Sequence, residues 1–201
     1  MCGRYYVDDE TAREIEKLVS QTDEKLRRES VGALGRLSAG DIHPADTAPV
    51  LSGREGGLCC QWQRWGIPGF KGKQVIFNAR SESVLEKPLF RDSVRHRRVV
   101  VPAASFYEWN ARKEKSAFYR EGQKLLFMAG FYSRYEDGDR FVILTTAANA
   151  SMRPVHDRMP LVIERDEVPR WILDDGSTEA ILRKTPCLLE RQTEYEQLTL
   201  F

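Results

Sequence analysis

The chain has 201 residues, 41% of them hydrophobic and 30% charged, which suits one globular domain and excludes a disordered chain. Its formal net charge is +1, so nucleic acid would have to be held by a local basic surface and not by the field of the whole molecule. The longest apolar runs are too short to span a bilayer, and the first residues do not resemble a secretion signal. We therefore expect a cytoplasmic protein with no membrane partner.

The first half of the chain mixes helical, loop and strand patterns. Residues 11–29 place apolar side chains on one face and predict a helix. Residues 31–48 are rich in Gly, Ala and Pro and predict a loop. Residues 58–65 and 74–77 predict two strands separated by a Pro- and Gly-containing turn. Residues 83–90 are typical of a short helix or a loop.

The second half is richer in strands. β-branched and aromatic residues predict strands at residues 99–101, 125–131, 141–146 and 161–163. The acidic, Gly-containing segment 136–139 is typical of a hairpin turn between the second and third of these. Helical patterns follow at residues 166–173 and 178–184. The whole pattern predicts a single mixed α+β domain over residues 2–187, in which strands predominate, followed by a tail at residues 188–201.

The cysteines argue against a metal site. The chain has no Cys-x-x-Cys pair and no histidine close in sequence to any of its cysteines, Cys2, Cys59, Cys60 and Cys187. A zinc site or a disulfide framework is therefore not expected, and neither is a metal or organic cofactor. In a reducing compartment the thiols stay free, and one of them is available for chemistry.

Cys2 offers the most distinctive chemistry in the sequence. Aminopeptidases remove an initial methionine when the second residue is small, which would leave Cys2 with an amine and a thiol side by side. Such an amine has a pKa of about 7.7–8.0, so a useful fraction is neutral. It condenses with an aldehyde to an imine, and the adjacent thiol then closes a thiazolidine ring. We expect Arg4 to lower the pKa of the thiol. Taken alone, a cysteine at this position is unremarkable.

Three other motifs place polar groups beside apolar residues near predicted strands. They are Asn78-Ala79-Arg80, Phe106-Tyr107-Glu108-Trp109 and His156-Asp157-Arg158-Met159-Pro160. Functional groups are often displayed in this way by a rigid scaffold. Each motif also has a structural interpretation. Asn78 can cap a turn, Glu108 can pair with an arginine, and His156 can be a half-buried, hydrogen-bonded histidine.

Together with the initial Met-Cys-Gly-Arg, these motifs resemble the SRAP family, named for SOS-response-associated peptidases and now viewed as abasic-site processors. The resemblance covers residues 2 to about 173, with the four motifs in the family's order. It implies barrel-like sheets flanked by helices, loss of Met1 by autocatalysis or by an aminopeptidase, and binding of single-stranded DNA. It also implies a thiazolidine cross-link between Cys2 and the abasic sugar, with AP-lyase cleavage as a side reaction.

The resemblance further implies roles for individual residues. Cys2 would be the nucleophile, Asn78 would orient the amino terminus or the sugar, and Glu108 would shuttle protons during imine formation. His156 would protonate the sugar as its ring opens. Contacts to DNA are implied for the arginines and aromatic residues Arg4, Arg80, Arg158, Trp65 and Phe70.

Other features bear on how DNA would be held. Two clusters of basic residues, at 91–98 and 112–115, are candidates for a basic surface. The chain departs from the family at Asp41, where relatives often have Asn, and a carboxylate there would repel phosphate. It departs again at Phe70, where many relatives have a second Trp.

The chain ends in Gln197-Leu198-Thr199-Leu200-Phe201, which resembles the peptide by which bacterial replication and repair proteins dock on the sliding clamp. Leu198, Leu200 and Phe201 supply apolar anchors, and Gln197 supplies an amide for backbone contacts. The alternative is a terminal strand packed into the core. The predicted partners are thus single-stranded DNA with abasic sites and, through this tail, the sliding clamp, with the protein itself a monomer.

Three other functions remain open from the sequence. Class II glutamine amidotransferases also begin Met-Cys-Gly and use Cys2 as an amino-terminal nucleophile, but their Asn-Gly-Glu and Arg-Gly substrate segments are not recognisable here. A peptidase acting on other proteins would fit the family's older description. The third alternative is a non-catalytic module that binds DNA or the clamp.

Overall fold

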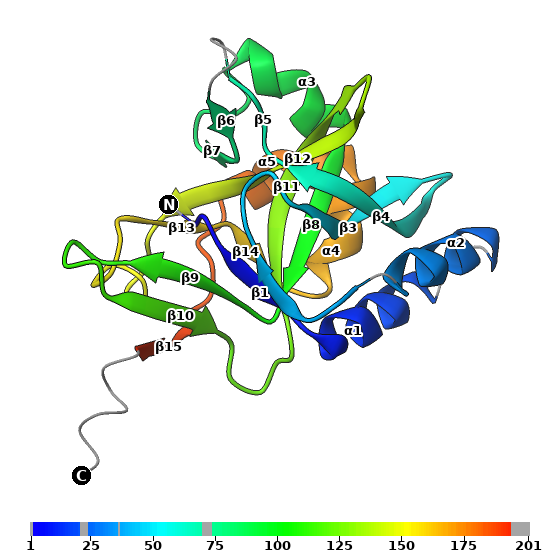
Figure 1. Ribbon diagram of the computed structural model, residues 1–201. Coiled ribbons are helices and arrows are strands. Elements are labelled where there is room, and N and C mark those ends of the chain that lie inside the picture. Colours follow the sequence, from blue (N-terminus) through cyan, green and yellow to red (C-terminus); the bar gives the residue numbers. More distant parts are fainter. Residues whose placement is uncertain (1, 21–23, 36, 70–73, 194–201) are drawn as a thin grey trace.

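The computed structural model describes residues 2–20, 24–35, 37–69 and 74–193 (Figure 1). Within these ranges a strand-rich α+β domain is formed, as predicted. None of the helices in the described ranges has the length and apolar character needed to cross a membrane.

Two helices pack side by side at one end of the molecule, α1 (Asp9–Val19) and α2 (Glu24–Leu34) (Figure 1). The Asp8 side chain accepts a hydrogen bond from the Thr11 amide at 2.9 Å and begins α1 with a capping box. The single helix predicted over 11–29 is wrong, because α1 ends at Val19 and a second helix, α2, begins at Glu24. That second helix also enters the predicted loop 31–48, since Leu26, Ser30 and Leu34 are buried at four-residue spacing.

The main sheet closes into a barrel, which confirms the barrel-like architecture. Its pairings run in a ring from β12 through β4, β3, β8 and β11 back to β12. The five strands are β3 (Thr47–Arg54), β4 (Gly57–Trp65), β8 (Arg98–Ala103), β11 (Leu126–Tyr135) and β12 (Gly138–Ala147). The predicted hairpin is confirmed, since β11 and β12 are antiparallel neighbours. The sheet is extended by β7 (Asn78–Arg80), β13 (Arg158–Pro160) and β14 (Val162–Ile163).

A second, five-stranded sheet carries the amino terminus (Figure 1). Its order is β15 (Glu190–Thr193), β10 (Lys115–Tyr119), β9 (Ser105–Trp109), β1 (Tyr5–Val7) and β2 (Gly40–Ile42). None of these short strands was predicted. Strand β2 lies in the predicted loop 31–48, and β15 shows that residues 190–193 of the predicted tail belong to the domain. A separate pair joins β5 (Ile67–Pro68) to β6 (Val75–Ile76).

Three further helices cover the barrel, α3 (Pro88–His96), α4 (Glu167–Leu173) and α5 (Thr178–Leu182). Successive residues of β8 and β12 face two separate apolar clusters, as the alternation of side chains along a strand requires. One cluster includes residues of all five helices. The other includes Cys2, the inner face of the second sheet, and Trp65. The amino terminus is therefore built into the core and is not a loose end.

Candidate active site

Strand β1 fixes the amino terminus between two neighbours. Tyr5 pairs with Phe106 on β9 and with Ile42 on β2, and the Tyr107 amide donates to the Arg4 carbonyl at 2.9 Å. The Tyr5 ring packs against Trp65 with ring centroids 5.2 Å apart. These contacts hold the backbone on both sides, so the position of Cys2 is set by the sheet.

The Cys2 side chain is buried, with 1% of its surface exposed. Burial raises the pKa of the Cys2 thiol to about 12, and the negative charge of nearby Glu108 adds to the shift. The expectation that Arg4 lowers this pKa is wrong in its net result. The thiol donates to the Arg4 carbonyl at 3.6 Å, and the cost of burying a thiolate outweighs this contact. The unreacted thiol is therefore protonated near neutral pH.

Asn78 holds the other end of the same residue. Its Nδ2 donates to the Cys2 carbonyl at 2.7 Å. Asn78 reaches this position because β7 runs parallel to β12, with Asn78 opposite Ile143. Its Oδ1 is buried and accepts no hydrogen bond from any described residue. A buried acceptor without a donor costs roughly 1–3 kcal/mol, and such an atom beside the terminal residue suits an amine or a sugar hydroxyl.

Glu108 is placed by the alternation of β9. Phe106 and Glu108 face the core, whereas Ser105, Tyr107 and Trp109 face outward. Glu108 is 3% exposed, and its charge acts on the Cys2 thiol. The structure thus brings the predicted Cys2, Asn78 and Glu108 together from three strands or strand ends that are distant in sequence.

His156 lies at the end of the loop between β12 and β13. Its Nδ1 accepts a hydrogen bond from the Arg158 amide at 3.0 Å and lies 2.8 Å from a carboxylate oxygen of Asp157. One nitrogen cannot accept the first bond and donate the second at once. The neutral ring, with its proton on Nε2, satisfies the Arg158 contact, and the protonated ring satisfies the Asp157 contact. His156 therefore has a ready partner in either protonation state.

The loop of His156 borders the same core cluster as Cys2. Met152 in the loop and Met159 just after it are both buried in that cluster. The loop of His156 and Cys2 therefore pack against the same apolar cluster.

The predicted DNA-contacting arginines differ in their surroundings. The Arg4 guanidinium lies over the Trp109 ring, 5.2 Å from its centroid, and 3.5 Å from Asp41. Arg80 is exposed on β7. Arg158 makes two bonds to Glu82, at 2.6 and 2.8 Å, and one to the Thr145 carbonyl at 2.7 Å. A phosphate would have to displace Glu82 to reach Arg158.

The predicted stacking role of Trp65 is wrong in this conformation. Its ring is 0% exposed, and its Nε1 donates to the Phe77 carbonyl at 2.9 Å. Trp65 is instead a core residue, and it lies in the same apolar cluster as Cys2. Phe70 lies outside the described residues, as do Gln197, Leu198, Leu200 and Phe201.

The basic cluster at 91–98 is also smaller than predicted. Arg98 is buried, with 2% of its side chain exposed. It donates to the carbonyl oxygens of Val94 and Ile172 and pairs with Asp175. Arg98 therefore joins the ends of two helices and offers nothing to DNA.

Sequence reasoning did not assign a role to Trp109. Its ring faces outward beside Arg4, where it is only half-buried. The signal was the alternation Ser105, Tyr107, Trp109 against Phe106, Glu108, which marks a strand with one open face. A half-buried aromatic ring next to an arginine offers an open face on which a base can stack.

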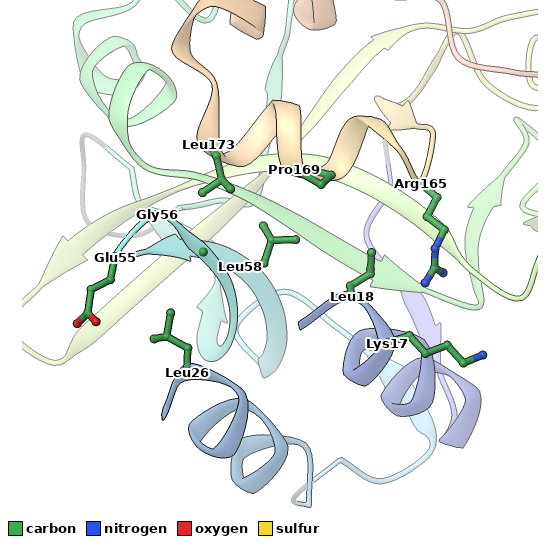
Figure 2. Close-up of a pocket in the computed structure, with 10 residues that line it drawn as sticks. Lys17, Leu18, Leu26, Glu55, Gly56, Leu58, Arg165, Pro169 and Leu173 are labelled. Atoms are coloured by element: carbon green, nitrogen blue, oxygen red, sulfur yellow. The ribbon is translucent and has the colours of Figure 1, made fainter. Parts of the chain in front are cut away.

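A cavity of about 400 Å³ lies elsewhere, between α1, α2, the β3–β4 turn and α4 (Figure 2). Its floor is apolar, with Leu18, Leu26 and Leu58, and Lys17 and Arg165 lie at one end. No residue predicted to be functional lines it. In the described part of the chain, no three His, Cys, Asp or Glu side chains gather as metal ligands would.

The fold and site define a class of protein, an α+β barrel in which a cysteine next to the amino terminus accepts a hydrogen bond from an asparagine amide and lies near a buried carboxylate. The chain belongs to the SRAP family, because the family model described as SOS response associated peptidase matches residues 1–199.

Similar curated proteins include the abasic site processing protein YedK of Escherichia coli. The two are 27% identical, over 88% of this chain and 82% of YedK. YoaM of Bacillus subtilis, also described as an abasic site processing protein, is 32% identical, over 54% of each chain. Among solved structures, a protein from Bacteroides thetaiotaomicron has a TM-score of 0.77 at 20% identity, covering 96% of this chain and 91% of that one.

Proposed function

We propose that this protein senses abasic sites in single-stranded DNA and captures them covalently through Cys2 after removal of Met1. Family membership, together with relatives that are described as abasic site processing proteins, supports the substrate class. The observation that carries the proposal is the bond between Asn78 Nδ2 and the Cys2 carbonyl, 2.7 Å long, beside buried Glu108. A chain terminus without a chemical role does not need a side-chain hydrogen bond to fix its position.

The reaction starts when the abasic sugar opens from its cyclic hemiacetal to the aldehyde. The Cys2 amine attacks the aldehyde carbon, forms a C–N bond, and releases one water to give an imine. The thiol then adds to the imine carbon, forming a C–S bond, while its proton passes to the nitrogen. The product is a thiazolidine, and the ring closure releases nothing further. Because amine and thiol belong to one residue, closure is effectively unimolecular.

Burial of the thiol sets the order of these steps. With a pKa of about 12 the thiol is a poor nucleophile near neutral pH, so the amine acts first. The charge of Glu108, which acts on this thiol, makes its carboxylate the natural acceptor for the thiol proton on the way to nitrogen. A buried thiol is also protected from oxidation before DNA arrives.

The other groups have separate tasks. Asn78 orients Cys2 through its carbonyl and offers Oδ1 to the new amine or to a sugar hydroxyl. His156 acts in its protonated form: it gives its Nε2 proton to the sugar ring oxygen as the ring opens, while the anomeric hydroxyl loses its proton to solvent. The neutral imidazole is then reprotonated from solvent. Arg4 and Arg80 contact phosphates, and Trp109 stacks on a base.

Several finer features belong to the same proposal. Met1 is removed by hydrolysis, either autocatalytically or by an aminopeptidase. Where ring closure fails, the imine permits AP-lyase cleavage of the strand. The domain acts as a cytoplasmic monomer, and residues 197–201 recruit it to the sliding clamp at replication forks.

The proposal is tested with a synthetic single strand carrying one abasic site. Mature protein is expected to form a species that survives denaturing electrophoresis. Cys2→Ala and a version whose amino terminus is extended by one uncleaved residue are expected to form none of this stable species. Equal adduct formation by the extended version would overturn the proposal. Glutamine hydrolysis without any adduct would instead favour the amino-terminal hydrolase.

A further inference from the structure

A single side chain, Asn149, closes the loop that carries His156. Asn149 is 8% exposed, at the start of the segment that joins β12 to β13. Its Oδ1 accepts hydrogen bonds from the Ser151 amide at 3.0 Å, the Ser151 hydroxyl at 2.6 Å, and the Met152 amide at 3.3 Å. Asparagine is suited to such a turn because its side chain imitates a backbone carbonyl.

Backbone hydrogen bonds connect the turn at Asn149 to His156. The Asn149 carbonyl accepts from the amides of Met152 and Arg153, at 3.2 and 2.9 Å. The Met152 carbonyl in turn accepts from the His156 amide at 3.1 Å. The Ala148 amide donates to the Asp157 carbonyl at 2.9 Å and closes the base of the loop. The place of His156 is therefore fixed by the turn at Asn149.

The other end of the Asn149 amide ties the loop to the segment before β15. Nδ2 donates to the carbonyls of Pro186 and Cys187, at 3.1 and 2.7 Å. The Leu189 amide donates to the Ser151 hydroxyl at 3.1 Å. Both donors of the amide are thus used, and three bonds join the loop to residues 186–189.

We propose that Asn149 is a positioning residue for His156, and that residues 186–189 act as a brace that holds the His156 loop in its reactive place. The inference rests on the proposed function, because it assigns His156 a proton-transfer task. The brace leads directly into β15, so the carboxyl-terminal part of the domain supports the site at the amino terminus.

Position matters because both partners of His156 Nδ1 belong to the loop and its exit. The Arg158 amide, which donates to Nδ1, favours the tautomer with its proton on Nε2, and it moves together with the Asp157 carboxylate if the loop relaxes. Misplacement of a catalytic group by about 1 Å can cost on the order of a hundredfold in rate.

The test uses three variants of the mature protein. Asn149→Ala removes both the turn and the brace. Asn149→Asp keeps the acceptor for the turn and loses the two donors to Pro186 and Cys187. Asp174→Ala is the matched control, since Asp174 closes a similar turn far from His156, accepting from the Gly176 amide at 2.9 Å and the Ser177 hydroxyl at 2.5 Å.

Two readouts are measured. The first is the rate of adduct formation against pH. The second is the tautomer of His156 from long-range nitrogen–proton spectra of the three histidines. Asn149→Ala is expected to slow the reaction by about tenfold or more, to flatten its pH profile toward that of His156→Ala, and to mix the His156 tautomers. Asn149→Asp should fall between, and Asp174→Ala should match wild type in both.

A wild-type rate and a single Nε2–H tautomer in Asn149→Ala would overturn the inference, even if that variant is less stable. Should Asn149→Ala not fold, Ser151→Ala decides, since it removes only the acceptor of the Leu189 amide and a contact to Asn149. A wild-type result there overturns the inference equally. If wild type forms no adduct, the proposed function fails, and the tautomer spectra still decide the positioning claim.

Discussion

At the scale of single residues, the chemistry depends on how burial and charge act on a few groups. Cys2 has a raised pKa because it is buried beside Glu108, and Asn78 keeps an acceptor that no described residue fills. A buried polar atom without a hydrogen-bond partner lowers the stability of the folded protein, and such atoms often mark functional sites.

Asp41 is expected to weaken DNA binding, because its carboxylate lies 3.5 Å from the Arg4 guanidinium and competes with phosphate. We predict that Asp41→Asn tightens binding of an undamaged single strand about two- to fivefold, the worth of an exposed ion pair. Fluorescence anisotropy at fixed salt measures this. Glu29→Gln, which removes the same charge from an exposed pair with Arg54, outside both basic clusters, is the control and should change nothing. An equal effect in both variants would mean that only net charge matters.

The buried thiols predict alkaline sensitivity. Burial raises the pKa of Cys60 to about 12, whereas an unfolded cysteine ionises near pH 8.5. The folded state therefore keeps a proton that the unfolded state loses, so stability is full below about pH 8.5 and falls as pH rises toward 12. We predict that raising the pH from about 8 to about 10 lowers the unfolding free energy of wild type by about 1–2 kcal/mol more than that of Cys60→Ala. Urea unfolding at both pH values measures the difference, and parallel losses would contradict it.

At the scale of elements, Arg98 links two helices to the barrel. It lies at the start of β8, and its guanidinium donates to carbonyls at the ends of α3 and α4. Removing it leaves these buried carbonyls without donors. We predict that Arg98→Ala lowers the unfolding free energy by about 2–4 kcal/mol, and that Arg98→Lys recovers part of this. Chemical denaturation measures both, and a loss below that of exposed Arg91→Ala would show that the carbonyls find other donors.

The elements that could be predicted are those whose signal is local. The hairpin of β11 and β12 has apolar, aromatic and β-branched runs on either side of a Gly-containing turn, and α4 and α5 follow clear helical patterns. The strands that were missed, such as β1, β2 and β15, have only three or four residues and exist because distant partners pair with them. Their stability comes from the sheet, so no local pattern reports them.

The candidate site shows the same division. Motifs identified Cys2, Asn78, Glu108 and His156, and the structure brings the first three together. The burial of Trp65 and the guanidinium pairing of Arg158 with Glu82 depend on tertiary packing. The role of Asn149 could not be predicted from the sequence for the same reason, since its partners lie 37 and 38 residues later in the chain.

At the scale of the whole molecule, the domain and the last eight residues are expected to have separable tasks. The described domain includes β15, whereas residues 197–201 resemble a peptide that docks on the sliding clamp. We predict that deleting residues 194–201 leaves adduct formation within about twofold of wild type, since the proposed reactive residues and the brace at residues 186–189 all precede the deleted segment. The same deletion should abolish retention by immobilised sliding clamp. Unchanged clamp retention would show that the tail does not bind the clamp.

The central claim is that the first residue of the mature chain supplies both nitrogen and sulfur to one carbon of the lesion. Intact-mass analysis of the adduct, followed by peptide mapping with and without borohydride, tests this most directly. The account predicts the mass of the chain lacking Met1 plus the DNA less one water, located on Cys2 and unchanged by borohydride, because a thiazolidine has no C=N bond. An adduct that retains Met1, lies on another residue, or gains two hydrogens on reduction would contradict it.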